Sequence, residues 1–560
     1  MNGCRHDLLR VDLTSQCCYR EPLAVELQQH LGGRSLGVAL LREYAGLAAM
    51  AAEMPLVICP GPLCGTGLPM STRCVLTGRS PLSGTLYSCA SGGAFAAKLH
   101  AAGLAALLIQ GRSNSPCLLE ITPEKQCLKP AVSLWGLETA AVMRQWGVAG
   151  AVAVIGPAGE RQVGYASLET SAGEPFGRGG FGAVLGYKGL KAIVVQGDCQ
   201  QQIADPVRFD KALEDLLRLF RASPFLLGPL GIHAHGTSAL VDLLQQRGML
   251  PGPNFRDFSG KATDWNARAL QQSTTSRAGG CFDCSVACKR LLATGTIQPG
   301  YDELAAFGGL CGINSLAAIC QLVDRCHALG LDPVSSAGTL ATWSECTGQP
   351  LTVALLTQLL EDIAAGTGPG QLPANGALAV ATALGKPELA MVVKGMELPP
   401  YDPRAATGLA LALAVAPHAG SHLDAWPLAS EILRKPVPTD RFSFDGKARV
   451  ISMFEDMGAA LDSLGICRFA AAAVELEELA ALMSGVSGQS CCAADLQQIG
   501  RRTVLQERAF NRTCGFSIAD DNLPQRFFSE PANGLAPLDQ ERFSEELAAY
   551  HRIRAVQECA

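Results

Sequence analysis

The spacing of apolar residues changes about one third of the way along the chain. Before that point, short apolar runs such as LLRVDL (8–13) and KAIVVQG (191–197) are bounded by glycine and polar turn residues, as strands are. One stretch in this part, LGGRSLGVALLREYAG (31–46), reads as a glycine turn that leads into a helix. The first part of the chain is therefore predicted to be rich in β-strands.

From Phe209 onward, apolar residues recur every three or four positions, as on one face of a helix. The segment FDKALEDLLRLFRA (209–222) also has acidic residues in its first half and basic residues in its second, which suits the helix dipole. A glycine ends the apolar pattern of SLAAICQLVDRCHALG (315–330), and TVALLTQLLEDIAAG (352–366) follows the same pattern. Helical patterns dominate again beyond residue 400.

These patterns predict an α+β protein of three domains. The chain has 560 residues, of which 48% are hydrophobic and 17% charged, and this composition is typical of a compact enzyme with a well-buried core. We place a β-rich domain at 1–205, followed by two mostly helical domains at 206–400 and 401–560.

Charge and hydropathy exclude several classes of function. The formal net charge is −6, and no block of lysine and arginine predicts a nucleic acid partner. The N-terminal residues lack the apolar core of a signal peptide, and no apolar run is long enough for a membrane-spanning helix. We therefore expect a cytoplasmic protein with no membrane insertion.

The 22 cysteines carry the first chemical signal, because a chain of this size is not a small disulfide scaffold. In CFDCSVAC, the residues Cys281, Cys284 and Cys288 bring three thiolates to one short loop. An iron–sulfur cluster or a zinc ion would accept them, and three core cysteines placed by chance are the remaining alternative. A zinc site usually has a second CxxC pair, which does not follow here, whereas a cubane cluster accepts three local ligands and one distant one. Cys467, in ALDSLGICRF, is the candidate for the distant ligand, and Gly465 would permit the turn before it.

With these motifs the sequence resembles the aldehyde:ferredoxin oxidoreductase family of tungsten enzymes, and the resemblance runs nearly end to end. It rests on many short matches in the family's order rather than on one of them. The matching stretches are LLRVDLT with LGGRSLG, GPLCGTGLPMSTRCVLTGRSPLSG (61–84), ASGGAFAAKLHAAG (90–103), IGPAGE (155–160), GRGGFGAVLGYKGLKAIVVQG (177–197), CFDCSVAC, ALGLD (328–332), GMELPPYDPR (395–404), DSLGIC (462–467) and NRTCGFSIADDNLPQRF (511–527).

The resemblance implies a β-rich, pterin-binding N-terminal domain and a cofactor at the interface with the two helical domains. The implied cofactors are a bis-pyranopterin (molybdopterin) carrying tungsten or molybdenum, a [4Fe–4S] cluster, and a Mg²⁺ ion that bridges the pterin phosphates. In this family the pterin sulfurs hold the tungsten, so no side chain is expected to bind it. The protein contributes position, charge and hydrogen bonds.

The resemblance also assigns roles to matching residues. Cys281, Cys284, Cys288 and Cys467 would bind the cluster, and Arg73 would bridge cluster and pterin. Arginine suits the pterin phosphates because its planar guanidinium donates bidentately, and glycine runs let backbone amides approach phosphate closely. The remaining cofactor-binding candidates are Ala90, Gly92 and Gly93 near the magnesium ion, Arg178 and Gly179 at a phosphate, and Asp332, Asp462 and Gly465 at the two pterins.

Two residues match the family's acid–base positions: Asp302 in GYDELAAFGG and His422 in AGSHLDA. Glu303 is the alternative carboxylate if the match slips by one residue. Asp302 could instead be a helix N-cap, and His422 a structural histidine. The family has Glu where this chain has Asp302, and Asp where this chain has His327, so substrate class and rate are open to change.

The sequence therefore predicts an oxygen-sensitive oxidoreductase that interconverts aldehydes and carboxylic acids. Electrons would pass through the cluster to ferredoxin or a similar iron–sulfur electron-transfer protein. The alternatives are the catalytic subunit of another tungsten-dependent reductase of the aromatic thioester type, a degenerate electron-transfer or assembly subunit, and a zinc protein without pterin. The family also allows a homodimer, for which the sequence itself gives no interface signal.

Overall fold

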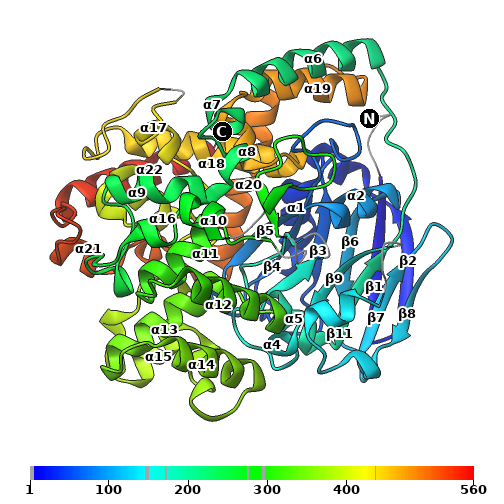
Figure 1. Ribbon diagram of the computed structural model, residues 1–560. Helices are drawn as coiled ribbons and strands as arrows, with labels where there is room; N and C mark the ends of the chain where they lie inside the picture. The colour runs from blue at the N-terminus through cyan, green and yellow to red at the C-terminus, as the bar shows by residue number, and fades with distance from the viewer. Residues whose placement is uncertain are drawn as a thin grey trace.

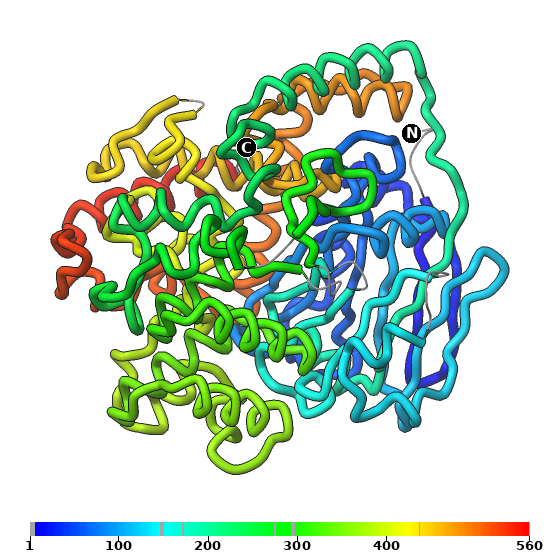
Figure 2. Tube along the Cα trace, viewed as in Figure 1, coloured from blue at the N-terminus to red at the C-terminus, as the bar shows by residue number. Residues whose placement is uncertain are grey.

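The computed structural model describes residues 6–145, 150–170, 173–273, 276–292, 297–435 and 437–559. Its two large sheets lie within residues 7–195, and the rest of the described chain is mostly helical, so the predicted α+β class is confirmed (Figure 1). The first third of the chain, blue to cyan, lies at the right of the view, and the later, mostly helical part lies at its left and along its top (Figure 2).

The first sheet has six strands in the order β2-β1-β6-β3-β4-β5. β1 and β6 run parallel, and the other neighbours are antiparallel. The strand predicted at 8–13 is β1, displaced by one residue. The strands are β1 (Asp7–Asp12), β2 (Cys17–Pro22), β3 (Leu56–Pro60), β4 (Arg73–Arg79), β5 (Leu86–Gly92) and β6 (Leu104–Gln110).

The second sheet has five strands in the order β10-β9-β11-β7-β8, and β11 is the strand predicted at 191–197. The apolar run of β11 is buried on both faces of the sheet. Ile193 and Val195 pack into the core that the two sheets share, while Ala192 and Val194 face a smaller core. The strands are β7 (Cys117–Ile121), β8 (Gln126–Pro130), β9 (Ala151–Ile155), β10 (Leu168–Thr170) and β11 (Leu190–Val195).

Three of the helices in the β-rich region, which we define as residues 7–195, pack directly on the two sheets. α1 (Gly33–Leu41) falls inside the helix predicted at 31–46 and packs its leucines on the first sheet. α2 (Ala94–Ala101) and α5 (Phe181–Lys188) contribute aromatic and aliphatic side chains to the core between the sheets.

The helical region, which we define as the described residues from 206 onward, contains the three helices predicted from periodicity, namely α6, α12 and α14. α6 lies against α19 along the top of Figure 1. α16 is buried along its whole length, which explains its uninterrupted apolar sequence. No helix in the described ranges is both long and apolar enough to cross a bilayer. The principal helices are α6 (Pro206–Ala222), α12 (Leu316–Leu329), α13 (Pro333–Thr347), α14 (Val353–Ala365), α16 (Thr407–Val415), α18 (Lys447–Leu464), α19 (Leu476–Ser487), α20 (Ala493–Thr513) and α22 (Gln540–Cys559).

Two short hairpins interrupt the helical region, and neither was expected from the sequence. β12 (Ser276–Gly279) pairs with β13 (Lys289–Leu292), and β14 (Val392–Val393) pairs with β15 (Met396–Glu397). The connection between β12 and β13 is the loop that contains CFDCSVAC.

Candidate active site

Two helices end in the same way, and both ends lie against the β-rich region. α12 ends at Gly330, whose φ is 73°, and α18 ends at Gly465, whose φ is 77°. In each case the next residue, Leu331 or Ile466, donates its backbone N–H over 2.9 Å to the carbonyl five positions earlier, which closes the last turn. A β-carbon is disfavoured in this left-handed conformation, so glycine is favoured at both ends.

The two helix ends approach glycines of the β-rich region so closely that no side chain fits between them. A β-carbon at Gly156 would lie 2.2 Å from the carbonyl oxygen of Leu329. One at Gly61 would lie 2.2 Å from the backbone nitrogen of Gly465. Glycine on the β-rich side therefore allows both helix ends to dock.

A backbone hydrogen bond then fixes the second residue after Gly330 and the second residue after Gly465. The N–H of Asp332 donates to the carbonyl of Tyr165 at 3.2 Å, and the N–H of Cys467 donates to that of Met70 at 2.8 Å. Asp332 and Cys467 thus occupy matching positions at the junction between the β-rich and helical regions, one as a carboxylate and one as a thiol.

The cysteine loop lies against the end of β5. Cys281 packs so closely there that a β-carbon at Gly92 would lie 2.5 Å from its Sγ. The hydroxyl of Thr72 donates to the carbonyl of Phe282 at 2.9 Å and holds the loop against the start of β4. Burial raises the pKa of Cys281, and it raises that of Cys288 to about 12, with a further contribution to each from nearby Cys467.

The structure therefore brings all four predicted cluster cysteines to one place, although they come from two distant segments. Cys284 lies near enough to Cys467 to raise the pKa of that thiol further, after burial. Cys284, Cys288 and Cys467 also pack against one apolar cluster that includes Val286.

Arg73 lies between the cysteines and the strand that carries Ala90. Its Nη2 donates to the carbonyl of Ala90 at 2.9 Å, and its Nη1 lies 4.0 Å from Sγ of Cys467. Burial lowers the pKa of Arg73, but Cys467 and Glu174 outweigh burial and raise it, so the side chain is a cation. Gly93, whose φ is 90°, follows this strand and begins α2.

Arg178 faces Asp332 at the first helix end. Its Nε lies 3.4 Å from Oδ2 of Asp332, and its Nη2 donates to the backbone carbonyl of Glu397 at 2.5 Å. Nη1 is buried and has no hydrogen-bond partner among the residues that the structure describes. Gly179 has a φ of 98°, and a β-carbon there would lie 2.8 Å from the ring of Tyr87.

Asp462, at the end of α18, is paired with two arginines. Arg468 donates to both of its carboxylate oxygens, at 2.9 and 2.6 Å, and Nη1 of Arg34 lies 3.5 Å away. Each predicted pterin carboxylate is therefore bound to an arginine, Asp332 to Arg178 and Asp462 to Arg468.

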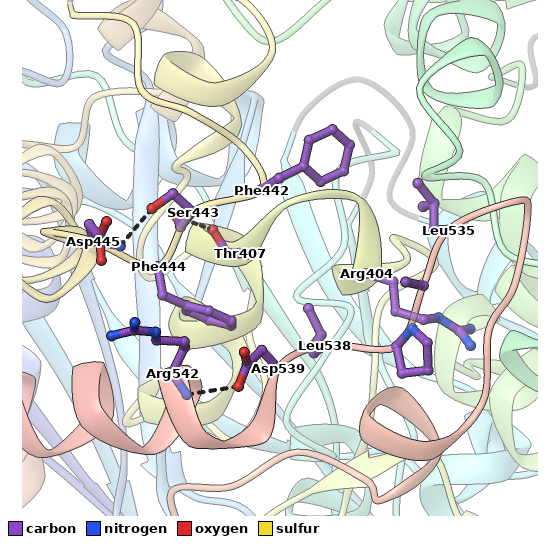
Figure 3. A pocket seen from close by; sticks show the side chains of 12 residues that line it. Arg404, Thr407, Phe442, Ser443, Phe444, Asp445, Leu535, Leu538, Asp539 and Arg542 are labelled. Carbon is purple, nitrogen blue, oxygen red and sulfur yellow. Dashed lines mark hydrogen bonds between the residues drawn. The ribbon is translucent and has the colours of Figure 1, made fainter.

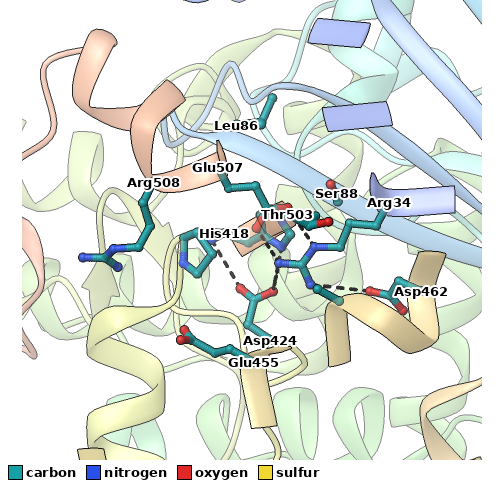
Figure 4. Close-up of polar contacts among 12 residues, drawn as sticks. Arg34, Leu86, Ser88, His418, Asp424, Glu455, Asp462, Thr503, Glu507 and Arg508 are labelled. Atoms are coloured by element: carbon teal, nitrogen blue, oxygen red, sulfur yellow. Dashed lines mark hydrogen bonds and ion pairs between the residues drawn. The ribbon is translucent and has the colours of Figure 1, made fainter. Parts of the chain in front are cut away.

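Arg34 is the centre of a buried ionic cluster that joins α1 to the helical region (Figure 4). It donates to both carboxylate oxygens of Glu507 at 2.8 and 2.7 Å and lies 2.9 Å from Asp424. His418 contacts the same two carboxylates, at 3.1 and 2.8 Å. Burial lowers the pKa of His418, but the two carboxylates outweigh it and raise that pKa. This cluster positions Asp462 and therefore the end of α18.

The structure places Asp302 beside His422. Oδ2 of Asp302 lies 3.6 Å from Nε2 of His422, and the ring of Tyr401 stacks on His422 with centroids 4.9 Å apart. Burial lowers the pKa of His422, and Asp302 offsets part of this, so the imidazole is neutral at pH 7. The N-cap alternative for Asp302 is wrong, because Gly300 is the N-cap of α11 (Tyr301–Ala305).

Glu303 points to a different partner. One of its oxygens accepts from the N–H of Gly300 at 2.8 Å, and the other lies 3.1 Å from Nε2 of His327. Nδ1 of His327 lies 3.1 Å from Glu169. Burial lowers the pKa of His327, but the two carboxylates outweigh it and hold the pKa well above its usual value, so His327 is a cation.

Sequence reasoning missed several residues at this junction. Arg34 lies in the glycine motif LGGRSLG and Lys289 directly follows Cys288, so each was close to a recognised signal. Arg468 directly follows Cys467 and was equally close to one, whereas Glu169 and Glu174 had no signal in the sequence because their partners are distant or lie on another element.

A cavity of about 440 Å³ lies elsewhere, between the loop at Phe442–Asp445 and the start of α22 (Figure 3). Its lining includes Arg404, Leu538 and Arg542, and none of the predicted site residues. The guanidinium of Arg404 is occupied by Asp402 and by backbone carbonyls. This cavity is therefore separate from the site above.

Comparisons with known proteins agree with the resemblance. The family descriptions "Aldehyde ferredoxin oxidoreductase, N-terminal domain" and "Aldehyde ferredoxin oxidoreductase, domains 2 & 3" match residues 8–197 and 211–558. The tungsten-containing aldehyde ferredoxin oxidoreductase of Pyrococcus furiosus is 33% identical, over 96% of this chain and 93% of that protein. The enzyme of the same name from Thermococcus kodakarensis is 32% identical, over 98% and 95%.

Two further similarities are more distant or more partial. A subunit from Pyrococcus furiosus named "Aliphatic sulfonate oxidoreductase, WOR-like subunit" is 30% identical over 34% of each chain. The solved active-site complex BamBC of benzoyl coenzyme A reductase has a TM-score of 0.84, covers 98% of this chain and 95% of its own, and is 20% identical. This last similarity shows that the fold is shared.

Proposed function

Because the chain belongs to the aldehyde ferredoxin oxidoreductase family, we propose that it oxidises an aldehyde to a carboxylic acid, or catalyses the reverse reaction. The observation that carries this proposal is the pairing of Asp302 with His422 at 3.6 Å, from two distant segments, with Arg178 near enough to affect the pKa of His422. A carboxylate beside a neutral imidazole suits proton transfer to and from water.

The cysteine arrangement fits a [4Fe–4S] cluster better than a zinc ion. Zinc would need its sulfurs to converge at about 2.3 Å from one point. Among the described residues, no group of three or more His, Cys, Asp or Glu is placed to hold a single ion. A cubane cluster binds each cysteine through a different iron and so keeps the sulfurs farther apart. Cys281, Cys284, Cys288 and Cys467 would hold it.

The arginines fit the phosphates of a bis-pyranopterin. Nη1 of Arg178 is a buried donor that lacks a partner in the described part of the chain, which costs free energy unless an acceptor such as a phosphate oxygen binds there. A carboxylate accepts about four hydrogen bonds. Asp332 already caps α13 by accepting from the N–H groups of Val334 and Ser335. Asp462 already accepts twice from Arg468. Each therefore keeps only the remaining acceptor capacity for a pterin edge. The backbone near Ala90 would hold the bridging Mg²⁺.

The reaction combines an aldehyde with water and yields a carboxylic acid, two protons and two electrons. When bound, the tungsten or molybdenum pyranopterin would accept the two electrons, and the cluster would pass them singly to ferredoxin or a similar carrier. His422, which is neutral, accepts a proton from water at Nε2. Asp302 stabilises the resulting imidazolium, and Tyr401 holds the ring by stacking on it.

Metal analysis of anaerobically purified protein tests the cofactor assignment. We expect a full complement of cluster iron and one tungsten or molybdenum per chain. Zinc in place of iron would overturn the cluster, and iron without either heavy metal would favour an electron-transfer or assembly role.

Viologen dye reduction with aldehydes tests the reaction. His422→Ala should keep its metals and lose turnover, whereas His551→Ala, on α22, should keep both. Loss of metal together with turnover in His422→Ala would make His422 structural. Dye-driven reduction of an aromatic thioester, without aldehyde oxidation, would establish the reductase alternative instead.

A further inference from the structure

The ion pair between Glu174 and Lys289 lies beside the cysteine loop and has no role in the proposed reaction. Lys289 directly follows Cys288, and its Nζ lies 2.6 Å from Oε1 of Glu174. The other carboxylate oxygen lies 4.0 Å from Nη1 of Arg73. The side chains of Glu174 and Lys289 are 16% and 25% exposed, so neither is a freely solvated surface charge.

Both members of this pair are held in place through their backbones. The carbonyl of Glu174 accepts from the hydroxyls of Ser91 and Thr170. Lys289 is paired with Gly279 across the hairpin, and its Nζ also donates to the carbonyl of Gly173 at 3.3 Å. The two charges therefore have fixed positions relative to the cysteines.

The two charges act on the cysteines with opposite sign. Lys289 directly follows Cys288, and Glu174 contacts both Lys289 and Arg73. Nη1 of Arg73 in turn lies 4.0 Å from Sγ of Cys467. A fixed anion disfavours negative charge added nearby, and a fixed cation favours it.

We infer that Glu174 and Lys289 together set the reduction potential of the cluster held by the four cysteines, Glu174 by lowering it and Lys289 by raising it. This inference rests on the proposed function. Reduction adds one electron to the cluster and makes or breaks no bond, and substrate oxidation supplies that electron. Nearby net charge is one of the factors that set such potentials, because a fixed anion opposes the electron and a fixed cation favours it.

The test is a reductive titration of the anaerobic holoenzyme, followed by the paramagnetic resonance signal of the reduced cluster. Glu174→Gln should shift the midpoint to a more positive potential, and Lys289→Met to a more negative one. The double variant should fall between the two single variants, because it removes one charge of each sign. The matched control is Lys129→Met, which breaks a 2.5 Å pair with Glu120 on strands β7 and β8 and should leave the midpoint unchanged.

The directions of the two midpoint shifts decide the inference. Opposite shifts with unchanged iron content support the inference. Shifts in the same direction, or none, with the cluster signal present would overturn the inference and leave the cluster assignment standing. Failure of one variant to retain iron leaves the other variant to decide the sign. Absence of a cluster signal in the unsubstituted protein would overturn the proposed cluster, and this inference with it.

Discussion

The C-terminal ends of α12 and α18 have the same backbone geometry but carry side chains of opposite charge. Both close on a left-handed glycine, both dock on a glycine of the β-rich region, and both are fixed by a backbone hydrogen bond two residues later. At the first end a histidine cation, His327, lies between two carboxylates. At the matching position of the second end, the carboxylate of Asp462 lies between two arginines.

This difference shows that the backbone fixes where a side chain projects, while the neighbours decide which side chain is stable there. The resemblance led us to expect an aspartate where this chain has His327, and the neighbours Glu169 and Glu303 suit a cation there. The same logic separates Asp332 from Cys467, since only the second end supplies a thiol, the soft ligand that the proposed cluster would take.

The largest expected effect is a difference in iron content between variants at the matching positions Cys467 and Asp332. Cys467→Ser should lose cluster iron and reduce viologen dye orders of magnitude more slowly, because an alcohol is a poor ligand for a cubane cluster. Asp332→Asn, at the matching position, should keep its iron. The comparison would fail if Cys467→Ser retained both iron and dye reduction.

The second prediction tests whether the two ends share one backbone design. Gly330→Ala and Gly465→Ala should each cost about 2–4 kcal/mol, because the new β-carbon meets backbone atoms 2.6 and 2.8 Å away in addition to the cost of the left-handed conformation. Urea unfolding measures this loss.

Gly348 provides the matched control, because it ends α13 with the same φ of 73° and has open space around it. Gly348→Ala should therefore cost only about 1 kcal/mol. Equal losses at all three glycines would mean that docking contributes nothing beyond the turn itself.

The third prediction places at the first helix end the aspartate that the resemblance led us to expect there. His327→Asp should lower stability by about 2–3 kcal/mol, because it places a third carboxylate between Glu169 and Glu303. His327→Gln, which can still form hydrogen bonds, should lose about 1 kcal/mol. A thermal unfolding series orders the variants, and a stabilised His327→Asp would disprove the charge argument.

The smallest expected effect is a pH dependence that distinguishes two histidines. His327 has a raised pKa, so its stabilisation is complete below its unfolded pKa of about 6.5 and is lost as the pH rises through its folded pKa. His422 has a lowered pKa, so its contribution is present above about 6.5 and is lost as the pH falls through its folded pKa.

Stability measured against pH for His327→Gln therefore tests the sign. The gap to the unsubstituted protein, about 1 kcal/mol, should be widest at acidic pH and should narrow toward alkaline pH. A gap that widened with pH would mean that His327 is neutral in the folded protein.

Local patterns of apolar residues predicted many of the strands and helices. The apolar run at 191–197 and the helical periodicity at 315–330 predicted β11 and α12 because burial alone decides those residues. The hairpin β12–β13 escaped notice because its four-residue strands are half-buried and have no apolar alternation.

The candidate site, like the fold, could be predicted from the sequence only in part. The cysteine motif and the resemblance indicated which side chains to examine, and the structure brings Asp302 and His422 together. The pairing of Glu169 with His327 depends on how α12 docks on β10, and a single sequence contains no trace of that contact.

The Arg34 cluster has a consequence for how the protein is made. Arg34 and its partner Glu507 are 473 residues apart in the chain. At about 5–20 residues per second, a ribosome would complete α1 roughly half a minute to a minute and a half before it reaches Glu507. The β-rich region can fold during that interval, but its most buried arginine must stay hydrated until the last helices emerge. Closing of the junction is therefore a late event in biogenesis, and it leaves an interval in which the proposed bis-pyranopterin could still enter.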